Sequence, residues 1–287
     1  MSTQKQYKSA EAKLHDGSTL DIEIYGDGPT ILLPVNPHPI EGEQAEQMRL
    51  YGADPALGQS LIQGLSDTFR VVALDYEGHV LNVVPKPQTL TPDNVVQDIL
   101  AVADSAKADR FAYYGYSWLA LVGLQLAVRT DRLSALVMGG YPPINGPYTE
   151  MLRVTTAAYE MSGGVYTPQG SDDEWSTAHL SKGQTQQFMT LYQALQGYDD
   201  QAAQTQITCP RLCFVGSADN IQYGKQWGDV YVSLADPIIN SRAELEAMGW
   251  DVRILAGLDH MSAMQAAQVL PIIRPWLISK LVAQPSA

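Results

Sequence analysis

The sequence predicts a doubly wound α/β fold, built on a mostly parallel sheet, with a helical lid inserted into it. Short, solid apolar runs recur along the chain and alternate with segments of helical periodicity, which is typical of a parallel sheet covered by helices on both faces. Residues 141–205 interrupt this alternation, because they contain no convincing strand but many aromatic and amide side chains. We therefore expect a core domain of residues 1–140 and 206–287 and a helical lid of residues 141–205.

The first strands are expected to form an antiparallel hairpin. Apolar and polar residues alternate on both sides of Asp16-Gly17, which is a signal for a tight turn. After residue 29 the pattern changes to continuous apolar runs, as expected of strands that are buried on both faces. These runs are residues 31–35, 71–74, 111–114, 133–138, 212–215 and 252–255.

Helical patterns fill most of the gaps between these runs. Asp54 is expected to cap a helix whose first residue is Pro55, and Thr91-Pro92 repeats that signal. A third helix should begin at or just after Ser117. A last helix, rich in apolar residues between 272 and 281, should close the chain.

Composition limits the classes of protein to which this chain can belong. Its 287 residues are 45% hydrophobic, which excludes wholesale disorder. Its formal net charge of −13 should repel nucleic acids and membrane surfaces, so we expect neither as a partner and a small-molecule substrate instead. The first residues lack the apolar core of a signal peptide, and no run approaches the about 20 apolar residues of a membrane span. We expect a cytoplasmic protein and leave its oligomeric state open, with a homodimer as one alternative.

No cofactor or metal is expected. Cys209 and Cys213 cannot form a disulfide framework, and with no histidine nearby they do not resemble a zinc site. We interpret them as small core residues in a reducing compartment. The five histidines are scattered, and the glycine motifs that bind dinucleotides or nucleotide phosphates are missing.

The strongest local signal surrounds Ser117. A strand runs into Gly115-x-Ser117-x and a helix follows at once, which is the context required of a nucleophile elbow. In such an elbow a strained turn projects the serine hydroxyl from the sheet, and the backbone N–H of Trp118 lies at the helix start, where it can face an oxyanion. The alternative is an ordinary serine N-cap before a buried helix.

Two further polar residues follow buried strands. Asp219 comes just after the run at 212–215, and His260 comes after the run at 252–255. Each alone would be interpreted as a loop-capping or structural residue. With Ser117, however, they all follow the carboxyl ends of expected parallel strands, and their order is Ser, Asp, His. We therefore predict a catalytic triad.

On these motifs the chain resembles the α/β-hydrolases of the esterase, lactonase and peptidase kind over nearly its whole length. Asp75-x-x-Gly78-His79 is similar to the family's D-x-x-G-H loop, Gly216-x-x-Asp219 to its acid loop and Gly257-x-x-His260 to its histidine loop. The resemblance implies acyl transfer, in which His260 takes a proton from Ser117 and Asp219 holds the imidazole in the correct tautomer.

The chain departs from the family pattern at two places. The family usually has His-Gly where this chain has Pro34-Val35, so the second oxyanion N–H would fall to Asn36, because Pro37 has none. The elbow normally has glycine at the position of Leu119, whose bulk we expect to be accommodated by a looser approach of the neighbouring strand.

The substrate pocket is expected to be mainly apolar or aromatic. Its predicted lining residues are Pro37, His38, Tyr116, Trp118, Tyr148, Trp175 and Tyr192. For His38 a solvated loop position is the alternative, and for the tyrosines and tryptophan of the lid it is packing within the lid core. The acidic run at 172–174 is interpreted as a solvated face, with recognition of a substrate amine as the alternative.

The predicted function is that of a serine hydrolase, which cleaves a carboxylic ester or lactone with an apolar or aromatic moiety through an acyl-enzyme on Ser117. A serine at the elbow argues against epoxide hydrolase or haloalkane dehalogenase chemistry, for which the family uses aspartate. Two alternatives remain open. One is an aminopeptidase resembling proline iminopeptidases, and the other is a non-catalytic ligand receptor on the hydrolase scaffold.

Overall fold

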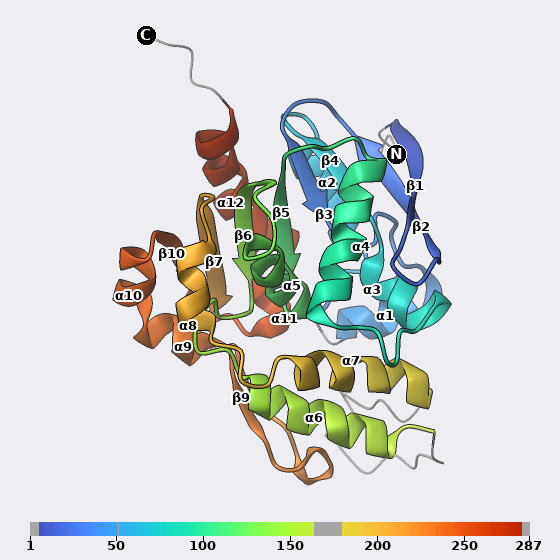
Figure 1. The fold of residues 1–287 in the computed structure, drawn as a ribbon, viewed down its shortest axis with the longest axis vertical. Helices are drawn as coiled ribbons and strands as arrows, with labels where there is room; N and C mark the ends of the chain where they lie inside the picture. Colours follow the sequence, from blue (N-terminus) through green and yellow to red (C-terminus); the bar gives the residue numbers. More distant parts are fainter. Residues whose placement is uncertain (1–5, 51, 164–179, 283–287) are drawn as a thin grey trace.

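A computed structural model describes residues 6–50, 52–163 and 180–282 and contains an eight-stranded sheet in the order β1-β2-β4-β3-β5-β6-β7-β10 (Figure 1). Only β2 runs against its neighbours, and every other adjacent pair from β4 to β10 is parallel. The strands are β1 (Tyr7–Lys13), β2 (Thr19–Tyr25), β3 (Thr30–Leu33), β4 (Arg70–Ala73), β5 (Phe111–Tyr116), β6 (Leu133–Gly139), β7 (Arg211–Gly216) and β10 (Trp250–Leu255). The predicted doubly wound, mostly parallel sheet is confirmed.

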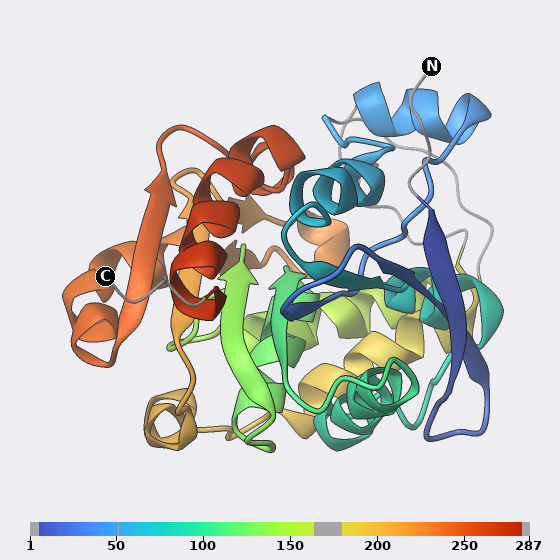
Figure 2. The ribbon, with the colours of Figure 1, turned by 90° about the horizontal axis from the view of Figure 1, so that it is seen from above.

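Helices cover both faces of this sheet, because alternate side chains of each strand point to opposite sides. In β4, Val71 and Ala73 pack in one apolar cluster, whereas Val72 packs in the other. Helices α2 (Leu57–Leu65) and α12 (Ala266–Leu281) cover the first cluster, and α4 (Pro92–Ser105) and α5 (Trp118–Ala127) cover the second (Figure 2). The shorter helices are α1 (Gly42–Leu50), α3 (Tyr76–Gly78), α9 (Ala235–Asn240), α10 (Arg242–Ala247) and α11 (His260–Ala263).

Two helix starts test the capping signals. Thr91 caps α4 as predicted, since its hydroxyl accepts the N–H of Asn94 at 3.4 Å and Pro92 is the first helical residue. The prediction for Asp54-Pro55 was wrong by two residues, because α2 begins at Leu57. The Asp54 carboxylate accepts the N–H of Ala56 at 2.8 Å, so it stabilises a turn that precedes the helix.

Helices occupy the described part of residues 141–205, between β6 and β7. They are α6 (Tyr148–Met161), α7 (Lys182–Ala194) and α8 (Asp200–Ala203). In Figure 1, α6 and α7 lie side by side below the carboxyl-terminal edge of the sheet. No strand occurs in this stretch among its described residues, as the sequence predicted.

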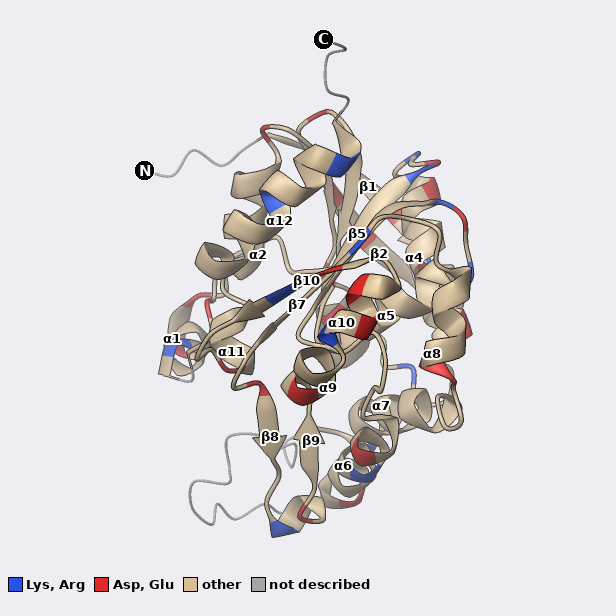
Figure 3. Ribbon diagram, turned by 90° about the vertical axis from the view of Figure 1, so that its left-hand side faces the viewer, with Lys and Arg blue, Asp and Glu red and all other residues tan. Residues whose placement is uncertain are grey.

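A second, two-stranded sheet was missed by the sequence analysis. Strands β8 (Asn220–Gln222) and β9 (Tyr231–Ser233) are antiparallel and extend from the main sheet towards α6 (Figure 3). Arg153 of α6 donates to the carbonyl of Gly228 in this hairpin at 3.0 Å. Strands of three residues are too short to produce a recognisable alternation, which is why the pattern did not reveal them.

No helix of the described residues is long and apolar enough to cross a membrane. Cys213 is fully buried in β7, and Cys209 is partly buried; both are free thiols. The interpretation of both as packing residues agrees with this burial.

A buried ionic cluster connects the turn of the β1–β2 hairpin with helix α4, which covers one face of the sheet. The side chain of Lys86 is fully buried, forms an ion pair with Asp16 in the hairpin turn, and lies 4.0 Å from the fully buried carboxylate of Asp98 in α4. Asp98 also accepts hydrogen bonds from the Tyr76 hydroxyl at 2.8 Å and the His15 backbone at 2.7 Å. Breaking one partner of a buried ion pair is costly because the other charge stays desolvated.

Replacing Lys86 with methionine is therefore expected to reduce the free energy of unfolding by about 3 kcal/mol, since Asp98 would lose its cation. Urea denaturation followed by circular dichroism measures this. The matched control is Arg242→Met, which breaks the half-exposed Arg242–Glu246 pair and should cost less than about 1 kcal/mol. Equal losses in both variants would contradict the structural role of the cluster.

Candidate active site

Ser117 lies at a strained turn between β5 and α5. Its backbone has φ 55° and ψ −131°, a conformation that residues other than glycine rarely adopt. The turn is held on both sides, since the Ser117 N–H donates to the Gly139 carbonyl and its own carbonyl accepts the Ala120 N–H, each at 2.8 Å. A Cβ at Gly115 would lie 2.2 Å from the Leu119 carbonyl oxygen, so the strand can approach the helix only with glycine there.

His260 and Asp219 form a hydrogen-bonded pair. Asp219 follows β7 with only 1% of its surface exposed, and His260 is the first residue of α11, after β10. The His260 Nδ1 lies 2.9 Å from both carboxylate oxygens of Asp219. A carboxylate at Nδ1 selects the tautomer with the proton on that nitrogen, which leaves Nε2 free to accept a proton.

The elbow and the histidine loop also touch each other directly. The Tyr116 hydroxyl donates to the His260 carbonyl at 2.7 Å, and the two rings lie 5.1 Å apart. Ser117 and His260 line the same two cavities. Within the described residues, no hydrogen bond joins the Ser117 hydroxyl to the imidazole. The structure thus brings Asp219 and His260 into contact and places Ser117 beside them, with the serine–histidine bond not formed.

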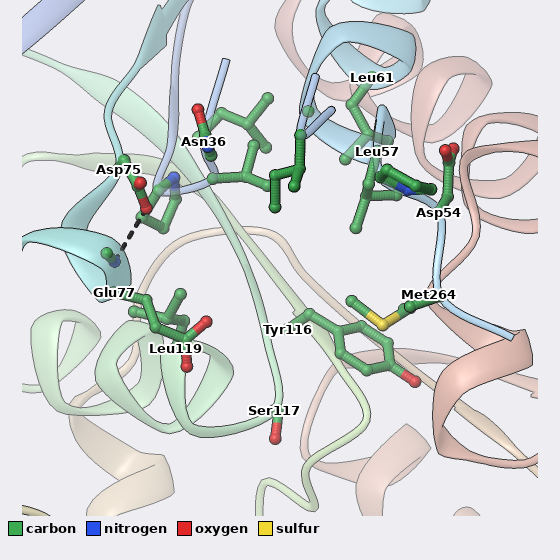
Figure 4. Close-up of a pocket in the computed structure, with 18 of the residues that line it drawn as sticks. Asn36, Asp54, Leu57, Leu61, Asp75, Glu77, Tyr116, Ser117, Leu119 and Met264 are labelled. Atoms are coloured by element: carbon green, nitrogen blue, oxygen red, sulfur yellow. Dashed lines mark hydrogen bonds between the residues drawn. The ribbon is translucent and has the colours of Figure 1, made fainter. Parts of the chain in front are cut away.

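The larger cavity has a volume of about 640 Å³ and lies between the elbow, α2, α11 and the loops that follow β3 and β4 (Figure 4). Leu57, Leu61 and Met264 supply part of an apolar wall. Its charged lining consists of the carboxylates of Asp54, Asp75 and Glu77, and no lysine or arginine of the described chain lines it. The cavity therefore favours ligands that are apolar or carry hydrogen-bond donors over anions.

The two residues predicted to supply oxyanion donors, Asn36 and Trp118, line this larger cavity. The Trp118 N–H is the first of α5, where backbone N–H groups have no partner inside the helix. Asn36 lines the same cavity, and its side-chain oxygen accepts the His38 N–H at 3.0 Å. A Cβ at Gly58 of α2 would lie 1.9 Å from the Asn36 carbonyl oxygen, so close packing on this helix holds the Asn36 loop in place.

Glu77 is a site residue that the sequence analysis missed. Its carboxylate accepts a hydrogen bond from the Trp118 indole at 2.7 Å. The residue as a whole is exposed on the cavity wall, but the protein atoms around its carboxylate reduce its hydration and raise its pKa, although the indole bond acts in the opposite direction. Burial likewise raises the pKa of Asp75, whose carboxylate accepts the Gly78 N–H at 2.9 Å. The position of Glu77 inside the D-x-x-G-H loop could have marked it as a candidate from the sequence. Its hydrogen bond to the Trp118 indole could not have been deduced, because the two residues are far apart in the chain.

Trp118 joins three parts of the molecule at the elbow. Besides its bond to Glu77, its ring meets Phe188 of α7 edge-on at 5.4 Å and Tyr76 at 6.1 Å. The residue after the proposed nucleophile therefore contacts both the D-x-x-G-H loop and the helical insertion. A displacement of α7 would therefore change the contact that Phe188 makes with Trp118 at the elbow.

The residues predicted to line the substrate pocket are divided between the two cavities and the core of the insertion. His38, Tyr116 and Trp118 line the larger cavity, and Tyr192 lines the smaller one. The prediction for Tyr148 was wrong, since it lines neither cavity. Its ring packs between Tyr141 and Tyr198 in the core of the insertion, at centroid distances of 6.4 and 5.9 Å.

Other sequence predictions have mixed outcomes. Pro37 is buried and lines neither cavity, whereas its neighbours Asn36 and His38 line the larger one. Trp175 and the acidic run at 172–174 lie outside the described residues. The Leu119 side chain is accommodated in the wall of the larger cavity. The Tyr113 hydroxyl donates to the Leu119 carbonyl at 2.9 Å, and β5 packs closely on α5 at Gly115. The expected looser approach of the strand was therefore wrong.

Comparison with solved structures supports the architecture. An esterase from Thermogutta terrifontis aligns with a TM-score of 0.61 at 16% identity, covering 96% of this chain and all of that one (100%). An N-acyl homoserine lactonase aligns at 0.60 and 11%, covering 98% and 100%. An epoxide hydrolase from hot-environment metagenomes, described as belonging to the alpha/beta hydrolases superfamily, aligns at 0.54 and 16%, covering 98% and 100%. The chain has the α/β-hydrolase fold.

Sequence comparison is weaker. No family model matches the chain. Proteins of Klebsiella pneumoniae (strain 342) and Klebsiella variicola (strain At-22), both named "Putative carbamate hydrolase RutD", are 26% identical to it over 177 residues. The matched segment covers 55% of this chain and 66% of those relatives, so slightly less than two thirds of their length is represented.

The raised pKa of Glu77 makes stability depend on pH. In the unfolded chain this carboxyl ionises near pH 4.5, and in the folded chain it ionises at higher pH because nearby protein atoms remove part of its hydration, although the residue as a whole is exposed. Its contribution to the free energy of unfolding should therefore fall as the pH rises from the unfolded to the folded pKa. In Glu77→Gln that contribution is missing. Urea titrations between pH 5 and 8 should show the wild-type stability decreasing relative to the variant, and a constant difference would contradict this.

Proposed function

We propose that the protein is a serine hydrolase that cleaves a carboxylic ester or lactone through an acyl-enzyme on Ser117. The observation that carries this proposal is the Asp219–His260 pair, whose histidine lines the same two cavities as a serine in a strained strand–helix turn. A hydroxyl in this turn is exposed to a ligand while its backbone is held by the sheet and by the helix.

In the proposed reaction, His260 Nε2 accepts the Ser117 proton as the serine oxygen attacks the substrate carbonyl carbon. The carbonyl oxygen becomes an oxyanion, which the N–H groups of Trp118 and Asn36 stabilise. The tetrahedral intermediate collapses, and the leaving oxygen departs with the proton from His260. Asp219 stabilises the imidazolium in between. A water then repeats the sequence on the acyl-enzyme and restores the Ser117 hydroxyl.

The names of similar proteins agree with chemistry at a carbonyl. They include an esterase, a lactonase and a carbamate hydrolase, and each name describes cleavage of a bond to an acyl carbon. The epoxide hydrolases among the structural neighbours share the fold. A serine at the elbow favours the acyl-transfer reaction for this chain.

An aminopeptidase is the second candidate, because the larger cavity has an acidic wall. Asp75 and Glu77 lie on the loop beside the elbow and could bind a substrate ammonium group. Raised pKa values weaken this candidate, since reduced hydration makes the ionised forms of both carboxyls, which would bind an ammonium group, less favourable than in water.

Fluorophosphonate labelling tests the nucleophile. One label per chain is expected, at Ser117, because the hydroxyl is activated by His260. The label should disappear in Ser117→Ala, fall strongly in His260→Ala and persist in the control Ser279→Ala, whose serine lies on α12. Hydrolysis of p-nitrophenyl esters should fall by roughly a thousandfold or more in the first two variants. Unlabelled but folded wild-type protein would instead indicate a ligand receptor.

Substrate type separates the two enzyme candidates. We expect turnover of p-nitrophenyl esters and little of proline β-naphthylamide, because among the described residues only the carboxyls of the larger cavity could bind the amine, and two of them ionise less readily than in water. Steady-state kinetics on both substrates, with wild type and Glu77→Gln, measures this. Efficient amide cleavage whose KM rises in Glu77→Gln would favour the aminopeptidase.

A further inference from the structure

A second, smaller cavity adjoins the proposed nucleophile. Its volume is about 80 Å³, and it shares with the larger cavity only Ser117 and His260. Its other walls come from the insertion and the β8–β9 region, and they are Tyr141, Met151, Tyr192, Ile221, Tyr223, Val232 and Leu234. The reacting groups therefore stand between two separate spaces that differ about eightfold in volume.

Apart from Ser117 and His260, the walls of the smaller cavity consist of aliphatic side chains, one methionine and three tyrosines. Phenol hydroxyls are the polar side-chain groups among the remaining seven residues, and burial raises the pKa of Tyr223 to about 12, so these phenols stay neutral near pH 7. Tyr141 is 2% exposed, and its hydroxyl interacts with that of Tyr192. A charged group placed here would lose its hydration and find only neutral hydroxyls of these tyrosines as partners.

The order of events in acyl transfer decides which part of a substrate each space holds. The leaving group must depart before the second step, and a water must then reach the acyl carbon beside His260. The acyl part stays bonded to Ser117 throughout. A space of about 80 Å³ cannot hold a departing alcohol and admit its replacement, whereas the cavity of about 640 Å³ can.

We propose that the smaller cavity is the acyl pocket and that it restricts the enzyme to short, uncharged acyl groups of about two to four carbons, with the alcohol part in the larger cavity. This inference rests on the proposed serine hydrolase function. Because this space is about one eighth of the larger cavity, it leaves room for a short chain beyond the carbonyl carbon and not for a long one. Longer acyl chains would collide with Leu234, Met151 and Tyr192.

A series of p-nitrophenyl esters tests the size limit, with acetate, butyrate, hexanoate and octanoate as acyl groups and one constant leaving group. We expect kcat/KM to be highest at two to four carbons and to fall at least tenfold at hexanoate, since misfit by a methylene in an apolar pocket costs about tenfold or more. The monoester of succinic acid, which has four carbons and a carboxylate, should react far more slowly than the butyrate.

Wall substitutions assign the pocket. Leu234→Ala should raise the hexanoate-to-acetate ratio of kcat/KM about tenfold. Met151→Ala is the second variant, because Met151 is only partly buried on α6 and its replacement threatens folding less. The matched control is Leu57→Ala in the larger cavity, which should change the preference among butyrate esters of different alcohols and leave the acyl ratio unchanged.

The outcomes are distinguishable. Ser117-dependent turnover that is fastest with octanoate, or an acyl ratio that shifts in Leu57→Ala and in neither wall variant, would overturn the acyl-pocket assignment while the hydrolase function stands. An absence of Ser117-dependent turnover with every ester would overturn the proposed function and the pocket assignment with it. A ratio that shifts in Leu234→Ala or Met151→Ala alone supports both.

Discussion

The left-handed backbone at Ser117 is the constraint on which the rest of this site depends. Such a conformation costs on the order of 1–3 kcal/mol for a residue other than glycine, so it persists only where the surroundings determine it. All ten residues of α5 are buried, and Gly115 allows β5 to approach the helix backbone closely. Packing of this helix against the sheet therefore offsets the strain, and the hydroxyl is presented at the edge of the sheet as a consequence.

The same edge gathers the remaining polar groups through neighbouring strands. β7 and β10 pair in parallel, with Leu255 opposite Gly216, so the loops that follow them start side by side. They are then tied together, because the Gly257 N–H donates to the Ser217 hydroxyl at 2.8 Å and a Cβ at Gly216 would lie 2.2 Å from the Leu258 carbonyl oxygen. The short distance between Asp219 and His260 follows from strand pairing and loop packing together.

The insertion between β6 and β7 divides the space around the elbow. Phe188 of α7 packs on Trp118, which lines the larger cavity, whereas Met151 of α6 and Tyr192 of α7 form walls of the smaller one. The β8–β9 hairpin closes that smaller space with Val232. The proposed catalytic groups and the proposed substrate-selecting groups thus come from different layers of the fold, an arrangement by which one scaffold can carry many specificities.

Sequence alone indicated the strands of the main sheet, the approximate positions of the four helices that cover it and the three polar residues that follow strand ends, because buried strands, caps and the elbow have local patterns. It did not reveal the β8–β9 hairpin, the Glu77–Trp118 bond or the packing of Tyr148 inside the insertion. Those features depend on contacts between segments far apart in the chain, for which no periodicity exists. The division into a large and a small cavity was decided only by the tertiary structure, since it arises where side chains from the sheet edge, the insertion and the hairpin meet around Ser117 and His260.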